Sequence, residues 1–313
     1  MPAQDSTSYL LTPEQLANIT DYSLLARIAV HGLLPGLHRS AYPGGGCEFR
    51  QYRNYTPGDD LRNVDWKLLA KHNRYYTKIY EDETNVNCLF LLDASGSMGY
   101  KGTRSPCSKL HYAATAVAVL AYLALRQGDR VGLVAYNSVG PDGLKTNRFQ
   151  VNVPLSGNSD QLYRLSANMQ RLTAQGQACH EEALNYAAQK TGGKSMIVVL
   201  SDFLEAEDRI KPLLKRIRTA QNDCIVLHVL DDDEIDLPFD QTTRFCDSES
   251  GNSVITSPPQ VREHYTLEME TFLQEIQRGC REAQIDYLRT QSSQDVANIL
   301  AAYLHHRRSS YSC

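Results

Sequence analysis

The sequence contains no C-x-x-C pair, although it has eight cysteines among its 313 residues. Cysteines at that spacing are typical ligands of zinc ribbons and form the redox pair of thioredoxin-type sites, so the sequence argues against both. Disulfide frameworks belong mostly to small secreted domains, and a chain of this length can build a core without them. We therefore expect reduced thiols in a cytoplasmic protein.

Long hydrophobic runs are also lacking. The longest one, Ala113–Leu125, is too short to cross a bilayer, and we expect no membrane span. Met1–Tyr9 is polar and has neither the charged region nor the apolar region of a signal peptide. The formal net charge of -4 argues against general attraction to nucleic acid or to anionic lipid.

Several enzyme signatures are absent. No P-loop motif occurs, and Ser97 is not in a nucleophile elbow, because Ser95 stands where the elbow has glycine. Asp93 lacks the second aspartate, two residues later, that haloacid-dehalogenase-type phosphatases use. No histidine has a sequence context that marks it as a general base. Three histidines leave open a catalytic triad formed only in space: His111, His180 and His228.

The sequence predicts an α/β fold. Four short runs are apolar at consecutive positions, as in parallel strands that are covered on both faces: Cys88–Leu92, Arg130–Tyr136, Met196–Leu200 and Cys224–Leu230. Segments with helical periodicity alternate with these runs: Lys109–Gln127, Asp160–Arg171, Glu181–Lys190 and Glu207–Asn222. This alternation implies right-handed crossovers. We predict a Rossmann-like, mostly parallel sheet with helices on both faces.

Other segments define the expected domain boundaries. Tyr22–Leu33 is typical of a helix, and Arg148–Val153 alternates like an edge strand. After the last apolar run we expect a helix, a strand and a helix, at Tyr265–Ala283, Asp286–Thr290 and Ser293–His306. Residues 1–80 have spaced rather than continuous hydrophobics, so we expect an extension packed on the main domain at 81–306, with a tail at 307–313.

The segment TPGDDLRNVDWKLLAKH, residues 56–72, predicts a helix after a Pro-Gly turn, capped by Asp59 or Asp60. Arg62 and Asp65 are spaced to pair on it, next to Trp66, the only tryptophan. One interpretation is a docked helix held by its cap and ion pair. The other is a partner-binding epitope, because Trp and Arg are frequent hot-spot residues.

Residues 39–78 are net positive and rich in tyrosine. Such a pattern also occurs in proteins that bind nucleic acid, but the acidic chain as a whole favours a different role. We expect this region to meet the acidic run Asp231–Asp236 or to lie in solvent.

Oxygen-bearing side chains follow two of the predicted strands. Asp93, Ser95 and Ser97 follow the first apolar run, and Asp202 follows the third. In open parallel sheets, ligands bind beyond the carboxyl ends of the strands, so these groups are expected at one edge. Carboxylates and hydroxyls suit a hard cation such as Mg²⁺ or Mn²⁺. The alternative is that Asp93 and the serines only cap the next helix.

These residues resemble the metal-ion-dependent adhesion site (MIDAS) of von Willebrand factor A domains. A wider set of motifs resembles the DUF58 family of bacterial proteins: GLHRS, EFRQYRNYTPGDDLRNVDW, YYTKIYEDETN, DASGSM, SKLHYA and GDRVGLVAY. The resemblance implies a Rossmann-like sheet with a cation site at its carboxyl edge. It also implies a non-enzymatic protein-interaction role, with a MoxR-type AAA+ ATPase as partner. A divalent-metal-dependent hydrolase at the same edge is the alternative.

The sequence departs from the adhesion-site pattern at one position. Those sites take a further ligand from a threonine in a Gly-Gly-Thr loop, whereas the stretch here is GQACHEEAL, with Gly176 and then Ala178 near the threonine position. An alanine methyl cannot bind a cation, so Thr173, Gln177 or water would have to substitute. Cys179 and His180 would suit a softer metal.

Overall fold

The computed structural model describes residues 18–33, 47–56, 64–72, 74–82, 86–138, 149–191, 195–204, 212 and 222–310. By its internal contacts the chain divides into one unit of Leu37–Val86 and another of Met1–Gly36 with Asn87–Cys313. The boundary between Val86 and Asn87 falls close to residue 81, where the main domain was expected to begin. The extension predicted over residues 1–80 is, however, divided between the two units. Helix α2 (Tyr22–Leu33) packs on the sheet unit. The packing of residues 37–80 on the main domain stays a prediction.

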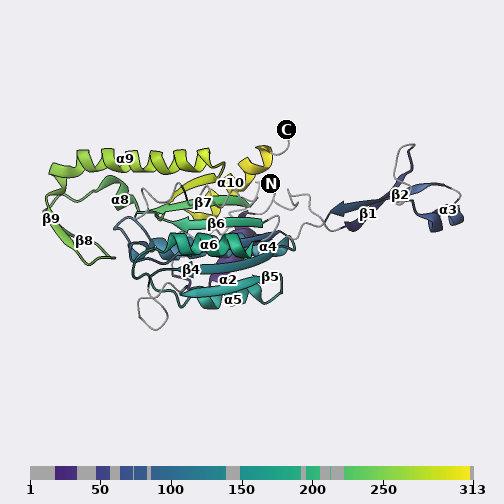
Figure 1. Ribbon diagram of the computed structural model, residues 1–313, viewed down its shortest axis with the longest axis horizontal. Helices are drawn as coiled ribbons and strands as arrows, with labels where there is room; N and C mark the ends of the chain where they lie inside the picture. The colour runs from purple at the N-terminus through teal and green to yellow at the C-terminus, as the bar shows by residue number, and fades with distance from the viewer. Residues whose placement is uncertain are drawn as a thin grey trace, which may run out of the picture. The chain divides into compact units, whose positions relative to one another are not determined.

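The larger unit contains a six-stranded sheet in the order β10-β7-β6-β3-β4-β5 (Figure 1). Neighbouring strands are parallel except β5, which pairs antiparallel with β4 at the edge. The four buried central strands coincide with the four apolar runs, which confirms the predicted fold class. The strands are β3 (Asn87–Asp93), β4 (Arg130–Tyr136), β5 (Val151–Ser156), β6 (Ser195–Ser201), β7 (Asp223–Leu230) and β10 (Asp286–Gln291).

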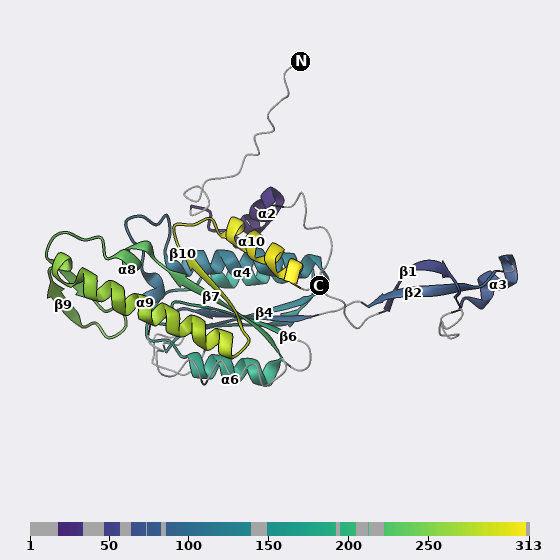
Figure 2. The ribbon, with the colours of Figure 1, turned by 90° about the horizontal axis from the view of Figure 1, so that it is seen from above.

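Helices cover both faces of the sheet (Figure 2). On one face lie α2 (Tyr22–Leu33), α4 (Lys109–Arg126) and α10 (Val296–Ser310). Helix α5 (Gln161–Met169) packs against α2 and α4 on the same face. On the other lie α6 (His180–Lys190) and α9 (Pro258–Glu282). The helix predicted over Glu207–Asn222 falls almost wholly outside the described residues.

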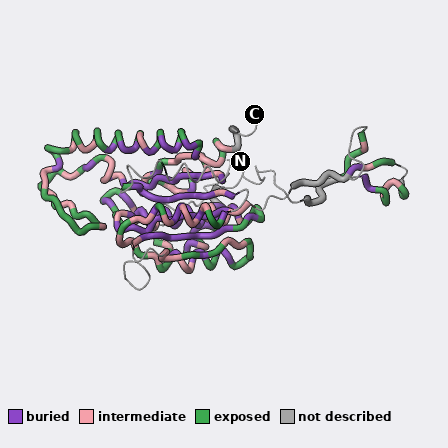
Figure 3. The backbone as a smooth tube through the Cα atoms, viewed as in Figure 1, coloured by how far each residue is buried: buried purple, intermediate pink, exposed green. Residues whose placement is uncertain are grey.

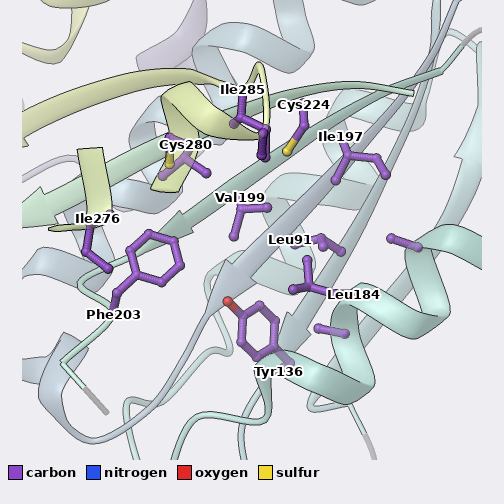
Figure 4. Close-up of a cluster of buried hydrophobic side chains, with 14 of the residues drawn as sticks. Leu91, Tyr136, Leu184, Ile197, Val199, Phe203, Cys224, Ile276, Cys280 and Ile285 are labelled. Carbon is purple, nitrogen blue, oxygen red and sulfur yellow. The ribbon is translucent and has the colours of Figure 1, made fainter. Parts of the chain in front are cut away.

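The core lies between the sheet and these helices, and Figure 3 shows the buried residues concentrated in the strands. Helix α4 is buried around most of its surface, because its small alanines let it lie close against the sheet. On the opposite face a cluster joins Leu91 of β3 and Val199 of β6 to Leu184 of α6 and Ile276 of α9 (Figure 4). This two-sided core fixes the carboxyl ends of the central strands.

Helix α2 belongs to the sheet unit through specific contacts. The Tyr22 hydroxyl lies 3.1 Å from Nδ1 of His111 on α4. Asp21 caps the helix by accepting a hydrogen bond from the Ser23 amide at 2.9 Å and another from the Ser166 hydroxyl of α5 at 3.1 Å. These contacts explain why the predicted extension does not form a single body.

The smaller unit contains an antiparallel hairpin of β1 (Cys47–Asn54) and β2 (Tyr76–Asp82), with α3 (Trp66–His72) between them. The predicted cap was wrong: Asp65 caps α3, accepting hydrogen bonds from the amides of Lys67 and Leu68 at 2.9 and 3.1 Å. Val64 lies in a β-bridge with Thr77 rather than on the helix. Trp66 is 56% exposed. Arg62, Asp59 and Asp60 lie outside the described residues.

The end of the chain differs from the expected tail. Helix α10 continues to Ser310, four residues past the predicted end at His306. Arg307 lies against the ends of two strands, with Nη2 3.4 Å from Asp223 Oδ2 and Nε 3.5 Å from Asp286 Oδ2. These ion pairs favour the extra helical turn.

One hairpin beyond the sheet was not predicted. It consists of β8 (Thr243–Cys246) and β9 (Ser253–Thr256), and follows the short helix α8 (Asp232–Asp236). Figure 1 shows this hairpin beyond the end of the sheet at which α8 lies. No described helix is long and apolar enough to cross a membrane.

Candidate functional site

Asp93 is the last residue of β3, and its side chain is fully buried. Its Oδ1 accepts a hydrogen bond from the Ser95 amide at 2.9 Å, and its Oδ2 accepts one from the Ser201 hydroxyl at 2.6 Å. Burial and the nearby charge of Asp202 raise the pKa of Asp93 to about 7. The two hydrogen bonds therefore hold the Asp93 carboxyl group in one orientation. A positive charge beside it would stabilise its ionised form.

Ser95 and Ser97 bring their hydroxyls together at the start of a short 3₁₀ helix, η2 (Ser97–Gly99). The two Oγ atoms lie 3.1 Å apart. Neither serine caps a helix: the residue before η2 is Gly96, with no side-chain cap, and α4 is capped instead by Ser108. The capping alternative therefore fails for the serines. For Asp93 it holds only in part, because the carboxylate accepts a hydrogen bond from one loop amide, that of Ser95.

Asp202 follows β6, next to β3 in the sheet, and is buried. Its Oδ2 lies 2.8 Å from the Lys109 ammonium nitrogen, and its Oδ1 lies 3.3 Å from the Leu204 amide. Burial opposes ionisation, but the Lys109 charge and hydrogen bonds from Lys109 and Ser97 lower the pKa of Asp202 overall. Through Ser97, the two strand ends meet as the sequence predicts.

Lys109, at the start of α4, contacts the candidate site, and our sequence reasoning missed it. Its fully buried ammonium pairs with Asp202 and, at 2.6 Å, with Oε1 of Glu234 on α8. Burial alone would lower the pKa of Lys109, but the two carboxylates raise it overall. The only sequence signal was a lysine at the start of an otherwise apolar helix.

The acidic run Asp231–Asp236 has its described contacts within the sheet unit. Asp231 accepts a hydrogen bond from the Gly102 amide at 3.0 Å, and Asp233 accepts one from the Thr103 amide at 2.7 Å. Arg104 Nε lies 2.7 Å from Asp233 Oδ1. These contacts fix the loop before α4. The expectation that the run also meets residues 39–78 stays a prediction.

The three candidate histidines lie in different places. His180 Nε2 is 4.0 Å from Asp93 Oδ2, and its Nδ1 is 3.1 Å from the Tyr136 hydroxyl. His228 bonds to Tyr287 and to the Asp202 backbone oxygen, both at 2.8 Å, and burial lowers its pKa to about 4. His111 contacts Tyr22 on the helical face. The structure thus brings two of them near the strand ends, but not all three together.

The loop that carries Ala178 closes over the strand ends through its backbone. The Gly176 oxygen accepts a hydrogen bond from the Gly96 amide at 2.8 Å, and Gln175 N lies 3.0 Å from the Ala94 oxygen. Gly176 has φ of 67°, a left-handed conformation that favours glycine. The Thr173 hydroxyl, considered as a replacement ligand, accepts a hydrogen bond from Gln150 at 2.8 Å.

The chemistry of these groups fits a hard cation better than a soft one. Among the described residues, no three His, Cys, Asp or Glu side chains cluster as metal ligands. This argues against a soft site at Cys179 and His180 and equally against a site of carboxylates alone, so a cation here would need the serine hydroxyls. Asp93, Ser95, Ser97 and Asp202 supply oxygen donors only. Nearby, both carboxylate oxygens of Glu249 are buried without a hydrogen-bond partner among the described residues. A buried carboxylate without a hydrogen bond is destabilising unless a positive charge lies beside it.

The mostly parallel sheet, its helices on both faces and the Asp93 loop at its carboxyl edge form the Rossmann-like α/β domain that the sequence predicts. The family model described as "Protein of unknown function DUF58" matches residues 51–272, so the chain belongs to the DUF58 family. The uncharacterised protein Rv1480 of Mycobacterium tuberculosis is 26% identical over 242 residues, which cover 76% of this chain and 72% of that protein.

Solved structures similar to this chain include the conserved hypothetical protein BatB from Bacteroides thetaiotaomicron. It is 18% identical, with a TM-score of 0.47, over 72% of this chain and 99% of that one. The VWA domain of SpRpn10 is 14% identical, with a TM-score of 0.41, over 69% of this chain and 94% of that one.

Proposed function

We propose that this protein is a non-enzymatic protein-interaction adaptor that recognises its partner at the carboxyl edge of the sheet. The recognition centre is a Mg²⁺ or Mn²⁺ site held by Asp93, Ser95 and Ser97, with Asp202 behind them. The proposal is supported most by the arrangement of Ser95 and Ser97. Their hydroxyl oxygens lie 3.1 Å apart, and neither serine caps a helix.

The residues around the site have distinct roles in this proposal. The Ser95 amide and the Ser201 hydroxyl hold Asp93 in place, and Lys109 holds Asp202 and balances part of the negative charge. A bound cation would supply an open coordination position for a carboxylate of the partner. The partner surface is therefore expected to carry an exposed Asp or Glu.

A MoxR-type AAA+ ATPase is the proposed partner, on the strength of the family resemblance. Such a partner works where ATP is present, which agrees with a cytoplasmic location. The adaptor proposal predicts that Mg²⁺ strengthens capture of the ATPase and that a chelator weakens it. Capture that is the same in both conditions would argue against a cation-dependent interface.

The site itself is tested by calorimetric titration of the purified protein with Mn²⁺. The Ser95→Ala, Ser97→Ala double variant should lose binding, because both hydroxyl donors of the site are removed. Ser156→Ala is the matched control, since Ser156 lies at the end of edge strand β5, opposite the start of β4. Equal affinity in the double variant and the parent would refute the site.

A further inference from the structure

The tip of the β8–β9 hairpin, residues 247–252, is a turn organised by Asp247. Asp247 Oδ1 accepts a hydrogen bond from the Glu249 amide at 2.9 Å, and its backbone pairs with Asn252 and Gly251. The Ser250 hydroxyl also donates to Asp247. The Asp247 carboxylate thus accepts hydrogen bonds from within the turn. The Glu249 side chain makes no such bond in the turn.

This hairpin tip lies directly against the candidate site. A Cβ atom placed on Gly96, between Ser95 and Ser97, would lie 2.5 Å from the Ser248 backbone oxygen and 3.4 Å from Cγ of Glu249. Gly96 has φ of -58°, which any residue adopts, so its backbone conformation does not require glycine. The close approach of the hairpin tip does require it.

The Glu249 carboxylate differs from the other acidic groups near the site. Asp93, Asp202 and Glu234 each accept hydrogen bonds or pair with Lys109. Both Glu249 oxygens are buried and have no hydrogen-bond partner among the described residues. An unpaired buried carboxylate is costly, and a cation beside it would offset that cost.

We propose that Glu249 is a built-in ligand of the cation site and occupies the position that an acidic side chain of the partner takes. The inference rests on the proposed function and adds a way in which partner binding is regulated. With Glu249 bound, the hairpin tip closes the site. A partner carboxylate must then displace Glu249 before it can bind.

The hairpin is built so that its tip can leave while its base stays fixed. At the base, Arg262 of α9 donates to the Leu237 and Phe239 backbone oxygens at 3.0 and 2.9 Å. The strands form a separate two-stranded sheet, in which Val254 and Ile255 are 64% and 68% exposed. An isolated two-stranded hairpin is only marginally stable, so release of the tip breaks little of the core.

The test compares the parent with Glu249→Gln, and with Glu270→Gln on the exposed surface of α9 as the matched control. In a chelator, Glu249→Gln should raise Tm, because it removes an unpaired buried charge. In saturating Mn²⁺ the parent should have the higher Tm. The Mn²⁺ affinity of Glu249→Gln should be lower than that of the parent by about tenfold or more. A merely structural glutamate would not give this reversal.

Water-proton relaxation provides a second readout. Mn²⁺ bound to Glu249→Gln should relax water faster than Mn²⁺ bound to the parent, because water replaces the lost carboxylate ligand. If the parent binds Mn²⁺ and Glu249→Gln matches it in affinity and relaxation, the built-in ligand is refuted while the site stands. If the parent does not bind Mn²⁺, the proposed function fails and this inference fails with it.

Discussion

The ammonium group of Lys109 lies 2.8 Å from the Asp202 carboxylate, and neither side chain is accessible to solvent. The pair joins the first residue of α4 to the loop after β6, and Glu234 of α8 completes it. A positive charge is therefore part of the fold beside the proposed cation site. Its removal would leave the buried Asp202 and the partly buried Glu234 without their positively charged partner.

Lys109→Met should lower the free energy of unfolding by about 3–5 kcal/mol, because it leaves the buried Asp202 and the partly buried Glu234 without a cationic partner. Urea denaturation at neutral pH measures the loss. The triple variant Lys109→Met, Asp202→Asn, Glu234→Gln should recover part of it, since neither carboxylate of the group then carries a charge. A loss of less than about 1 kcal/mol in Lys109→Met, the range typical of exposed ion pairs, would contradict this account.

Asp21→Ala should destabilise the docking of α2 by about 1 kcal/mol, the usual effect of losing a helix cap. The Ser23 hydroxyl is the main cause that holds the pKa of Asp21 below its usual value. A lowered pKa stabilises the folded state above the unfolded pKa, and the effect is lost as pH falls through the folded value. Hydrogen exchange of α2 amides should therefore separate variant and parent at pH 7 and much less below pH of about 3.

The two interpretations of the segment around Trp66 predict different results. Asp65→Ala should destabilise the smaller unit by about 1–2 kcal/mol, because Asp65 caps α3. Trp66→Ala should change stability little, since the side chain is 56% exposed. If Trp66 is a partner epitope, the same variant should reduce ATPase capture. Unchanged capture would favour the docked-helix interpretation.

The hydrolase alternative predicts activity that the adaptor does not. Phosphatase and esterase screens with Mg²⁺ or Mn²⁺ should show no turnover that depends on Ser95. His228 bonds to Tyr287 and to the Asp202 backbone through its two ring nitrogens, so it is not disposed to act as a base toward Ser97. Turnover in the parent that disappears in Ser95→Ala would overturn the adaptor proposal.

Sequence reasoning succeeded where local patterns determine structure. Continuous apolar runs predicted the four central strands, and alternation predicted β5 at the edge. The meeting of Asp93 and Asp202 followed from a general property of parallel sheets, because neighbouring strands present their carboxyl ends together. These features need only the order of elements along the chain.

The remaining features depend on contacts between distant segments. Lys109 and Glu234 are 125 residues apart, and no spacing rule relates them. The strands of the β8–β9 hairpin have four residues each and are largely exposed, so they lack the hydrophobic pattern of a buried strand. Glu249 lies in a polar stretch typical of a turn, and only its approach to Gly96 gives it significance.

Anomalous scattering from a crystal grown with Mn²⁺ tests the central claim most directly. The account predicts a manganese peak within coordination distance, about 2.2 Å, of oxygens from Asp93, Ser95 and Ser97. A crystal that shows manganese elsewhere, or no peak beside these three residues at saturating Mn²⁺, would contradict it.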